Sequence, residues 1–235
     1  ATSPRGVVAA ASYEARTFGV HSAMPGFRAR ELCPHAAFVG SSMDTYAAVS
    51  DEVHAVFGEV TSEIEPLALD EAFLDITGSI GLFGGPLEVG RYVKRRVREQ
   101  TRLPVSVGIA PSKLVAKIAS DLDKPDGMTV LYPVDYASRL DPLPVAVLPG
   151  IGRETLKRLS GTGIDTVRDL RLADQAVLER VFGRFAQKTR ERAAGIDNRP
   201  VIPRRAEKSI SAEQTYDSDL TRREDMEREL LHLAE

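Results

Sequence analysis

Apolar positions in the first 132 residues form two kinds of pattern. Some recur at the spacing of about 3.6 residues that is typical of helices, and others form the short runs of branched or aromatic residues that are typical of strands. The helical pattern covers residues 13–18, 29–32, 44–57 and 89–97, and another helix begins after Ser112, a residue type common at N-caps. The strand pattern covers residues 64–69, 73–76, 105–109 and 128–132, and residues 6–11 read as extended chain. This part is predicted to be α+β.

The pattern changes after residue 132. Residues 141–144 (DPLP) are typical of a connector, and residues 147–194 predict short helices separated by glycine, without a convincing strand. Residues 201–205 predict an exposed linker, followed by a strand near Ser209 and a helix near Arg222. The fold class is therefore α+β, with a helical part and the start of a further unit after it.

Composition is that of an ordinary globular protein, with 43% hydrophobic and 28% charged residues. No apolar run reaches the roughly 18 residues of a membrane span, and the single cysteine, Cys33, excludes an internal disulfide and predicts a small buried side chain. These features fit a cytoplasmic setting without a membrane partner.

Charge is unevenly distributed, although the net charge is only −3. Residues 41–75 contain nine Asp or Glu and no Lys or Arg, whereas residues 132–200 contain 12 Lys or Arg and nine Asp or Glu. This favours a protein that holds metal ions in one place and phosphates in another. Randomly distributed solvated faces remain the alternative on charge alone.

Asp70 and Glu71 are the first candidates for chemistry, because they lie at the junction of two predicted strands. A strand junction or bulge allows neighbouring side chains to reach one site, and clustered carboxylates hold the divalent ions of phosphoryl transfer. An exposed acidic turn is the alternative.

Two basic groupings could bind phosphate oxygens. Tyr13 and Arg16 are three residues apart at a helix start and share a face. Lys113, Lys117 and Lys124 lie on a narrow stripe if their helix is regular, and Lys124 is favoured because Pro125 and Gly127 fix the backbone after it. Solvated surface residues are the alternative for both groupings.

Residues 148–152 (LPGIG), with the apolar register that follows, resemble a helix-hairpin-helix motif. Gly150, Ile151 and Gly152 would present backbone N–H groups to a DNA phosphate near a helix N-terminus. Such contacts position DNA without reading its sequence. An ordinary turn between packed helices is the alternative.

Together these segments resemble a Y-family translesion DNA polymerase of the bacterial DNA polymerase IV type. The matching segments occur in family order: residues 11–25 (ASYEARTFGVHSAMP), 69–76 (LDEAFLDI), 107–113 (VGIAPSK), 124–127 (KPDG), 148–152 and 195–201 (GIDNRPV). The resemblance implies fingers at 1–39, a palm at 40–132, a thumb with the helix-hairpin-helix at 133–200, and a linker with the start of the little finger at 201–235.

The resemblance also implies a function. The family adds dNMP to a primer 3′ end using two Mg²⁺ ions, without proofreading. Asp70 and Glu71 would be the catalytic metal ligands, Tyr13, Arg16 and Lys124 would hold the dNTP triphosphate, and Gly150, Ile151 and Gly152 would contact primer–template DNA. A monomer is expected, with a sliding clamp as partner of the full-length protein.

Three departures from the family pattern bear on activity. The opening palm strand, with another metal-binding Asp and the aromatic gate against ribonucleotides, has no counterpart, and Asp44 cannot replace that Asp because it begins a predicted helix. The little finger is incomplete, and Ala68 stands where the family usually has Ser. The chain is therefore expected to be a fragment that extends primers poorly or not at all.

Two other functions compete with this interpretation. A non-catalytic DNA-binding module would use the helix-hairpin-helix without a working metal site. A metal-dependent nuclease would explain Asp70 and Glu71, but it would leave Tyr13, Arg16 and Lys124 without a role.

Overall fold

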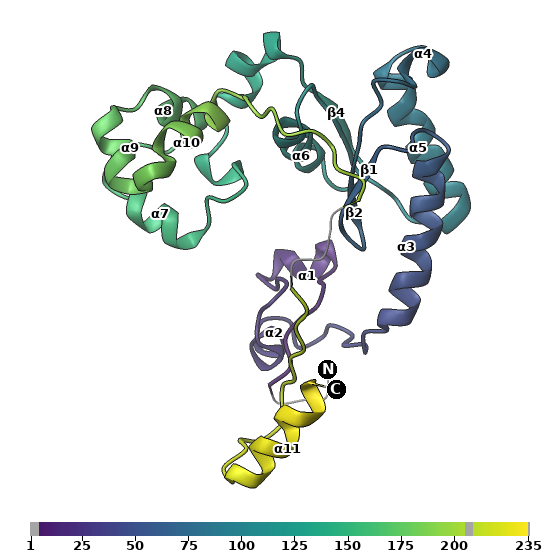
Figure 1. Ribbon diagram of the computed structural model, residues 1–235, viewed down its shortest axis with the longest axis vertical. Helices are drawn as coiled ribbons and strands as arrows, with labels where there is room; N and C mark the ends of the chain where they lie inside the picture. The colour runs from purple at the N-terminus through teal and green to yellow at the C-terminus, as the bar shows by residue number, and fades with distance from the viewer. Residues whose placement is uncertain (1–4, 205–208, 235) are drawn as a thin grey trace. The chain divides into compact units, whose positions relative to one another are not determined.

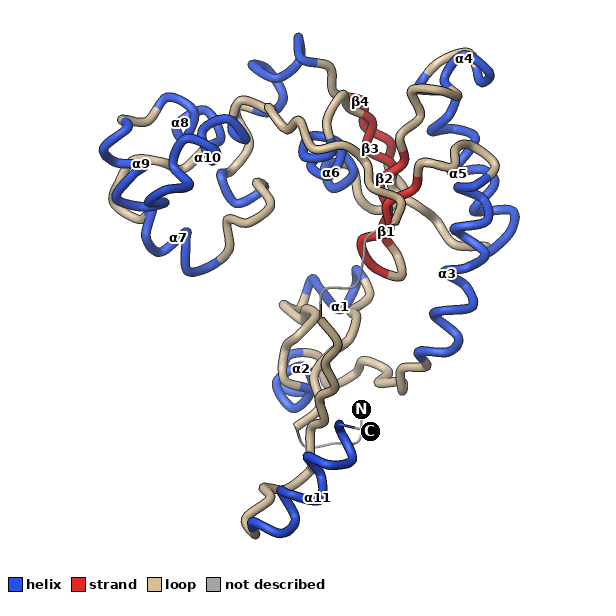
Figure 2. The backbone as a smooth tube through the Cα atoms, in the orientation of Figure 1, coloured by secondary structure: helices blue, strands red, loops and turns tan. Residues whose placement is uncertain are grey.

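A computed structural model describes residues 5–204 and 209–234 and combines helices with short strands, as expected for the α+β class. The chain forms two compact units. The first comprises residues 1–45 and 206–235, and the second comprises residues 46–205. Figure 1 shows the elements of each unit, and Figure 2 distinguishes helices from strands.

The first unit contains three helices among its described residues: α1 (Tyr13–Thr17), α2 (Gly26–Leu32) and α11 (Arg223–Ala234). Its small core is formed by Val20, Met24, Ala29 and Cys33, so the prediction of a buried cysteine is confirmed. The extended segment at residues 6–11 forms no strand, but it makes an isolated bridge between Val7 and Pro25 and packs Val8 and Ala11 against this core.

The second unit begins within α3 (Met43–Gly58), which packs with α5 (Pro86–Thr101) around a core that includes Val56, Phe57, Val93 and Val97. A hairpin formed by β1 (Ile64–Ala68) and β2 (Glu71–Leu74) packs against this core through Ile64, Ala72 and Leu74. The short helix α4 (Ile80–Phe83) follows the hairpin and was not predicted.

A second strand pair is parallel and lies next to one helix. Strands β3 (Val107–Ile109) and β4 (Met128–Val130) pair in register, and α6 (Lys113–Leu122) connects them. Gly108 is required here, because a Cβ at this position would lie 2.0 Å from the Ala116 carbonyl oxygen. All four predicted strands of this region are confirmed, each within a few residues of its expected bounds.

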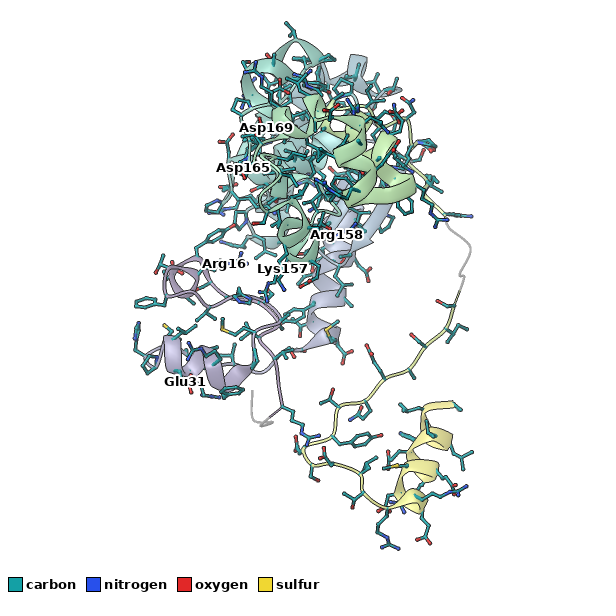
Figure 3. All side chains as sticks on the ribbon, turned by 90° about the vertical axis from the view of Figure 1, so that its left-hand side faces the viewer. Arg16, Glu31, Lys157, Arg158, Asp165 and Asp169 are labelled. Carbon is teal, nitrogen blue, oxygen red and sulfur yellow. The ribbon has the colours of Figure 1, made fainter. Side chains whose placement is uncertain are left out.

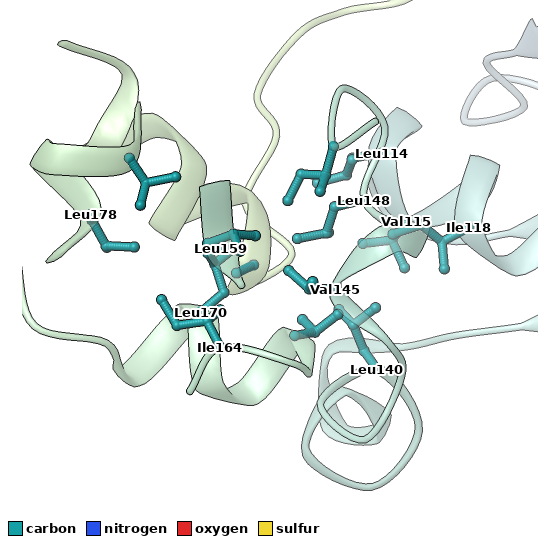
Figure 4. Packing of buried hydrophobic residues seen from close by; sticks show 14 of the residues in the cluster. Leu114, Val115, Ile118, Leu140, Val145, Leu148, Leu159, Ile164, Leu170 and Leu178 are labelled. Atoms are coloured by element: carbon teal, nitrogen blue, oxygen red, sulfur yellow. The ribbon is translucent and has the colours of Figure 1, made fainter. Parts of the chain in front are cut away.

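The helical part that follows contains α7 (Arg153–Leu159), α8 (Val167–Leu172), α9 (Gln175–Phe182) and α10 (Ala186–Ala193). Its core continues into α6 through Leu114, Val115 and Ile118, as Figure 4 shows. The N-terminal half of α6 is therefore fixed by packing on the helical part.

Two expectations for the C-terminal segment differ in outcome. The helix near Arg222 is confirmed as α11, but the strand expected near Ser209 is wrong: described residues 209–222 form no strand. Strands need a partner for their backbone groups, and none of the described residues pairs there. Of the predicted linker, Arg205 lies outside the described residues.

Candidate active site

The β1–β2 hairpin carries Asp70 and Glu71 at its tip. Leu69 and Asp70 form the two-residue turn, Ala68 pairs with Glu71 across it, and the register shifts between Pro66 and Ala68. Asp70 is exposed, whereas Glu71 is half-buried. The prediction that the two acids lie at the junction of two strands is confirmed.

The turn is attached to α3 by a hydroxyl group. Ser50 Oγ, which is 7% exposed, donates a hydrogen bond of 2.6 Å to the carbonyl oxygen of Leu69, the residue before Asp70. Sequence reasoning did not identify Ser50. Its position within a helical apolar pattern was the only available signal, since a polar residue on such a face needs a partner when buried.

Glu71 is joined to Lys124 by a row of alternating charges along α6. Lys117 Nζ lies 2.5 Å from Glu71 Oε1 and 4.0 Å from Asp121 Oδ2, and Lys124 Nζ lies 2.6 Å from Asp121 Oδ1. Lys117 and Asp121 have the i,i+4 spacing of neighbours on a helix surface, and Lys124 follows Asp121 by three residues, just beyond the end of α6. Asp121 was not predicted, although this spacing could have identified it.

The expected stripe of three lysines is wrong. The helix ends at Leu122, so Lys124 lies beyond it, and Lys113 is buried at 7% exposure where it pairs with Glu65 of β1. Helix α6 therefore directs Lys113 and Lys117 at carboxylates of the hairpin instead of presenting one solvated face.

The backbone after Lys124 is fixed, as the sequence predicted. A Cβ on Gly127 would lie 2.0 Å from the Asp123 carbonyl oxygen, so only glycine fits there. Lys94 Nζ donates to the Asp126 carboxylate at 2.6 Å and to the Asp126 carbonyl at 2.8 Å. The hydrogen bond from Lys94 lowers the pKa of Asp126 and keeps this ion pair charged.

Tyr13 and Arg16 lie on one face of α1 in the first unit, as predicted. The Arg16 guanidinium is 5.4 Å from the centre of the Tyr13 ring, and Arg16 Nε donates to the Ala11 carbonyl at 3.1 Å. Ser12 caps the helix by accepting from Ala15 N at 3.2 Å. Tyr13 is 49% exposed.

The turn at residues 148–152 opens α7. Gly150 has φ +95°, a left-handed conformation that favours glycine, and Gly152 is the N-cap of α7. Ile151 is buried, and its N–H donates to the Leu148 carbonyl at 3.0 Å. Ile151 therefore serves the turn itself, while the two glycines leave its outer side unobstructed.

A hollow of about 270 Å³ lies at this turn, and three of its lining residues are cationic: Arg158, Lys188 and Arg192. None of the described residues that line it is acidic. Burial lowers the pKa of Arg192, but an arginine remains charged at neutral pH. Figure 3 labels Arg158 on α7 next to Lys157. The hollow has the charge expected of an anion site.

The donor set at the hairpin tip suits a hard divalent cation, since Mg²⁺ prefers carboxylate oxygens. Within residues 5–204 and 209–234, however, no group of three or more His, Cys, Asp or Glu side chains is gathered for a metal. The tip therefore provides two ligands, one of which, Glu71, is already paired with Lys117. Also within these ranges, no helix is long and apolar enough to cross a membrane.

Comparisons with known proteins identify the family to which the chain belongs. Residues 1–121 match the impB/mucB/samB family. A DNA polymerase IV from Alkalilimnicola ehrlichii is 44% identical over 231 residues, which are 98% of this chain and 65% of that protein. The chain thus spans less than two thirds of the length of this relative.

Solved structures show the same fold. A DinB crystal structure from Sulfolobus solfataricus has a TM-score of 0.77 at 34% identity, over 83% of this chain and 58% of that one. An insertion ternary complex of Dbh DNA polymerase has a TM-score of 0.76 at 33% identity, over 84% of this chain and 58% of that one. The resemblance to Y-family polymerases of the DNA polymerase IV type is confirmed, and the chain belongs to the impB/mucB/samB family.

Proposed function

We propose that the protein containing this chain is a template-directed DNA polymerase of the error-prone translesion class, which adds dNMP to a primer 3′ end. The observation that carries the proposal is the row from Glu71 through Lys117 and Asp121 to Lys124. Glu71, a candidate metal ligand, and Lys124, a candidate triphosphate ligand, lie in the same unit, and this supports the proposal. The polymerase relatives support the same conclusion.

Asp70 and Glu71 are proposed to hold Mg²⁺, with further ligands needed for a complete two-ion site. When bound, the ions neutralise the triphosphate and the leaving pyrophosphate. The chain's own contribution is to hold the two carboxylates at the hairpin tip, where Ser50 and Lys117 contact the residues on either side of Asp70.

Tyr13, Arg16 and Lys124 are proposed to bind the triphosphate of the incoming dNTP. A guanidinium binds phosphate oxygens bidentately, and a tyrosine hydroxyl or a lysine ammonium donates to single oxygens. The exposure of Tyr13 and the shared face of Tyr13 and Arg16 support this role.

Primer–template DNA is proposed to lie against the turn of Gly150, Ile151 and Gly152. The cationic hollow beside the turn supports this assignment, because phosphate contacts position a duplex without reading its sequence.

The proposed function also implies a domain assignment. In this scheme residues 1–39 are the fingers, 40–132 the palm, 133–200 the thumb, and 201–235 the linker with the start of the little finger. The family resemblance alone suggests a sliding clamp as a further partner.

Primer extension by the full-length protein tests the proposal. Asp70→Asn and Glu71→Gln should each reduce synthesis by at least about a hundredfold, since bound metal contributes several kcal/mol to such reactions. Glu88→Gln is the matched control, because it converts an exposed carboxylate of α5 to an amide and removes only the pair with Arg91. Unchanged synthesis by Asp70→Asn would refute the metal role.

A non-catalytic DNA-binding module is the second candidate. The cationic hollow at the Gly150–Gly152 turn favours it, because such a hollow can hold a DNA phosphate without a metal ion. Under this alternative, Asp70→Asn leaves biological function intact, while substitutions in the cationic hollow abolish it. Assaying damage tolerance in cells with both kinds of variant separates the two functions.

A further inference from the structure

Ser50 makes one strong polar contact outside its own helix, and that contact is at the candidate site. Its hydroxyl donates to the Leu69 carbonyl oxygen at 2.6 Å, and the residue is 7% exposed. The neighbouring turn is solvent-accessible, with Leu69 at 42% exposure and Asp70 exposed as well. A buried donor on α3 thus reaches an exposed hairpin tip.

The direction of this hydrogen bond is fixed by its surroundings. A carbonyl oxygen can only accept, so Ser50 Oγ must donate its single hydrogen to Leu69. His54 Nδ1 lies 2.9 Å from the Ser50 carbonyl and 3.4 Å from Ser50 Oγ, so Nδ1 carries the hydrogen that the Ser50 carbonyl accepts. The histidine therefore does not compete for the serine hydrogen.

The acceptor carbonyl belongs to the peptide unit that leads into Asp70. Because a peptide unit is planar, holding the Leu69 oxygen restrains the orientation of the whole unit and thereby the position of the Asp70 Cα. On the other side of Asp70, the Glu71 carboxylate is held by Lys117. The tip is thereby fixed at both neighbours of Asp70.

Packing between α3 and the hairpin does not require this hydrogen bond. The apolar core already joins Val53, Val56 and Phe57 of α3 to Ile64, Ala72 and Leu74 of the hairpin. Those contacts hold the base and middle of the strands but leave the turn itself without apolar support. The hydrogen bond from Ser50 therefore holds the turn, whose position the apolar core does not fix.

We propose that Ser50 is a positioning residue for the metal-binding carboxylates: it fixes the Leu69–Asp70 peptide and so the direction in which Asp70 leaves the turn. This inference rests on the proposed role of Asp70 as a metal ligand. Residues that orient a metal ligand raise affinity for the ion without touching it, and their loss commonly costs 10- to 100-fold.

Mn²⁺ binding to this chain, followed by the electron paramagnetic resonance signal of the free ion, tests the proposal. Ser50→Ala should weaken Mn²⁺ binding by about tenfold. Thr162→Val is the matched control, because it removes a hydroxyl–carbonyl bond of the same 2.6 Å length, from Thr162 Oγ1 to the Leu159 carbonyl, in the helical part. It should leave Mn²⁺ binding unchanged.

The variant Asp70→Asn distinguishes the positioning role of Ser50 from the metal-ligand role of Asp70, on which it rests. If Asp70→Asn weakens Mn²⁺ binding but Ser50→Ala binds like the wild-type chain, Ser50 has no positioning role. If Asp70→Asn binds Mn²⁺ like the wild-type chain, Asp70 is not a metal ligand, and the proposal for Ser50 loses its basis. Circular dichroism checks that each variant is folded. Ser50→Cys introduces a weaker hydrogen-bond donor of similar size and should bind Mn²⁺ with intermediate affinity. Wild-type affinity in this variant would overturn the proposal.

Discussion

The ammonium group of Lys113 on α6 donates a hydrogen bond to the carboxylate of Glu65 on β1, and both side chains are almost completely buried, at 7% and 2% exposure. Two neighbours complete the contact. Lys113 also donates to the Pro200 carbonyl at 3.0 Å, and Ile202 N donates to Glu65 Oε2 at 2.9 Å. A buried ion pair thus joins the hairpin, α6 and the segment that follows α10.

Removing one partner of this pair should be strongly destabilising. Lys113→Met leaves Glu65 charged and buried, which costs about 3–5 kcal/mol in comparable pairs. Urea unfolding measures the loss. Arg91→Gln is the control, since it breaks an exposed pair with Glu88 and should cost less than about 1 kcal/mol. Equal losses in the two variants would contradict the prediction.

Asp197 should make stability depend on pH in the acid range. Its carboxylate accepts from Arg199 Nε at 2.6 Å and from Leu114 N at 3.1 Å, and the hydrogen bond from Arg199 lowers its pKa. A carboxylate with a lowered pKa in the folded state stabilises above its unfolded pKa of about 4 and loses this contribution as the pH falls below that value.

Urea unfolding at pH 6 and pH 3 checks this prediction. Asp197→Asn should be less stable than the wild-type chain at pH 6, and the difference should shrink at pH 3. A constant difference at both values would show that the charge of Asp197 is not responsible.

Lys117 should compete with a divalent cation for Glu71. Its ammonium lies 2.5 Å from Glu71 Oε1, with both side chains partly exposed. Such a pair is worth up to about 1 kcal/mol, so Lys117→Gln should strengthen Mn²⁺ binding by at most about fivefold. Lys157→Gln, which breaks the pair with Glu154 on α7, is the control for charge alone. Weaker Mn²⁺ binding by Lys117→Gln would contradict the competition.

The cationic hollow should determine the salt dependence of DNA binding. Arg158→Gln and Lys188→Gln should each weaken binding across sequences and lower the salt slope by about one. Fluorescence anisotropy at several salt concentrations provides the measurement. Arg91→Gln and Arg95→Gln on α5 remove the same charge elsewhere and should leave the slope unchanged.

Gly108 should not tolerate alanine. The added Cβ would lie 2.0 Å from the Ala116 carbonyl oxygen and 2.3 Å from Ser120 N, so α6 must move away from β3 at a cost of about 1–3 kcal/mol or more. Gly81→Ala in α4 is the control, because no atom lies within 4 Å of its Cβ. Thermal unfolding should show a loss for the first variant and none for the second.

Local elements could be predicted from sequence where a short-range rule determines them. The spacing of Leu114, Val115 and Ile118 specified α6, and Ser112 does accept from Val115 N as its N-cap. The hairpin tip followed from two apolar runs around Asp70 and Glu71. Tyr13 and Arg16 share a face because i,i+3 geometry alone decides it.

Long-range partners could not be predicted in this way. Nothing in the local pattern indicates that Lys113 pairs with Glu65, 48 positions earlier in the chain, or that Ser50 reaches Leu69 across 19 positions. The lysine stripe was wrong because the helix ends at Leu122, before Lys124. The strand near Ser209 was wrong because a strand depends on a partner that its own sequence does not specify.

The row along α6 contains two carboxylates and two ammonium groups, so its formal charges cancel at neutral pH. Each carboxylate of this row therefore has an ammonium group beside it before any ligand binds. In the proposed function, ligand entry is an exchange of counter-ions: a cation would take the place of Lys117 at Glu71, and a polyphosphate would take the place of Asp121 at Lys124.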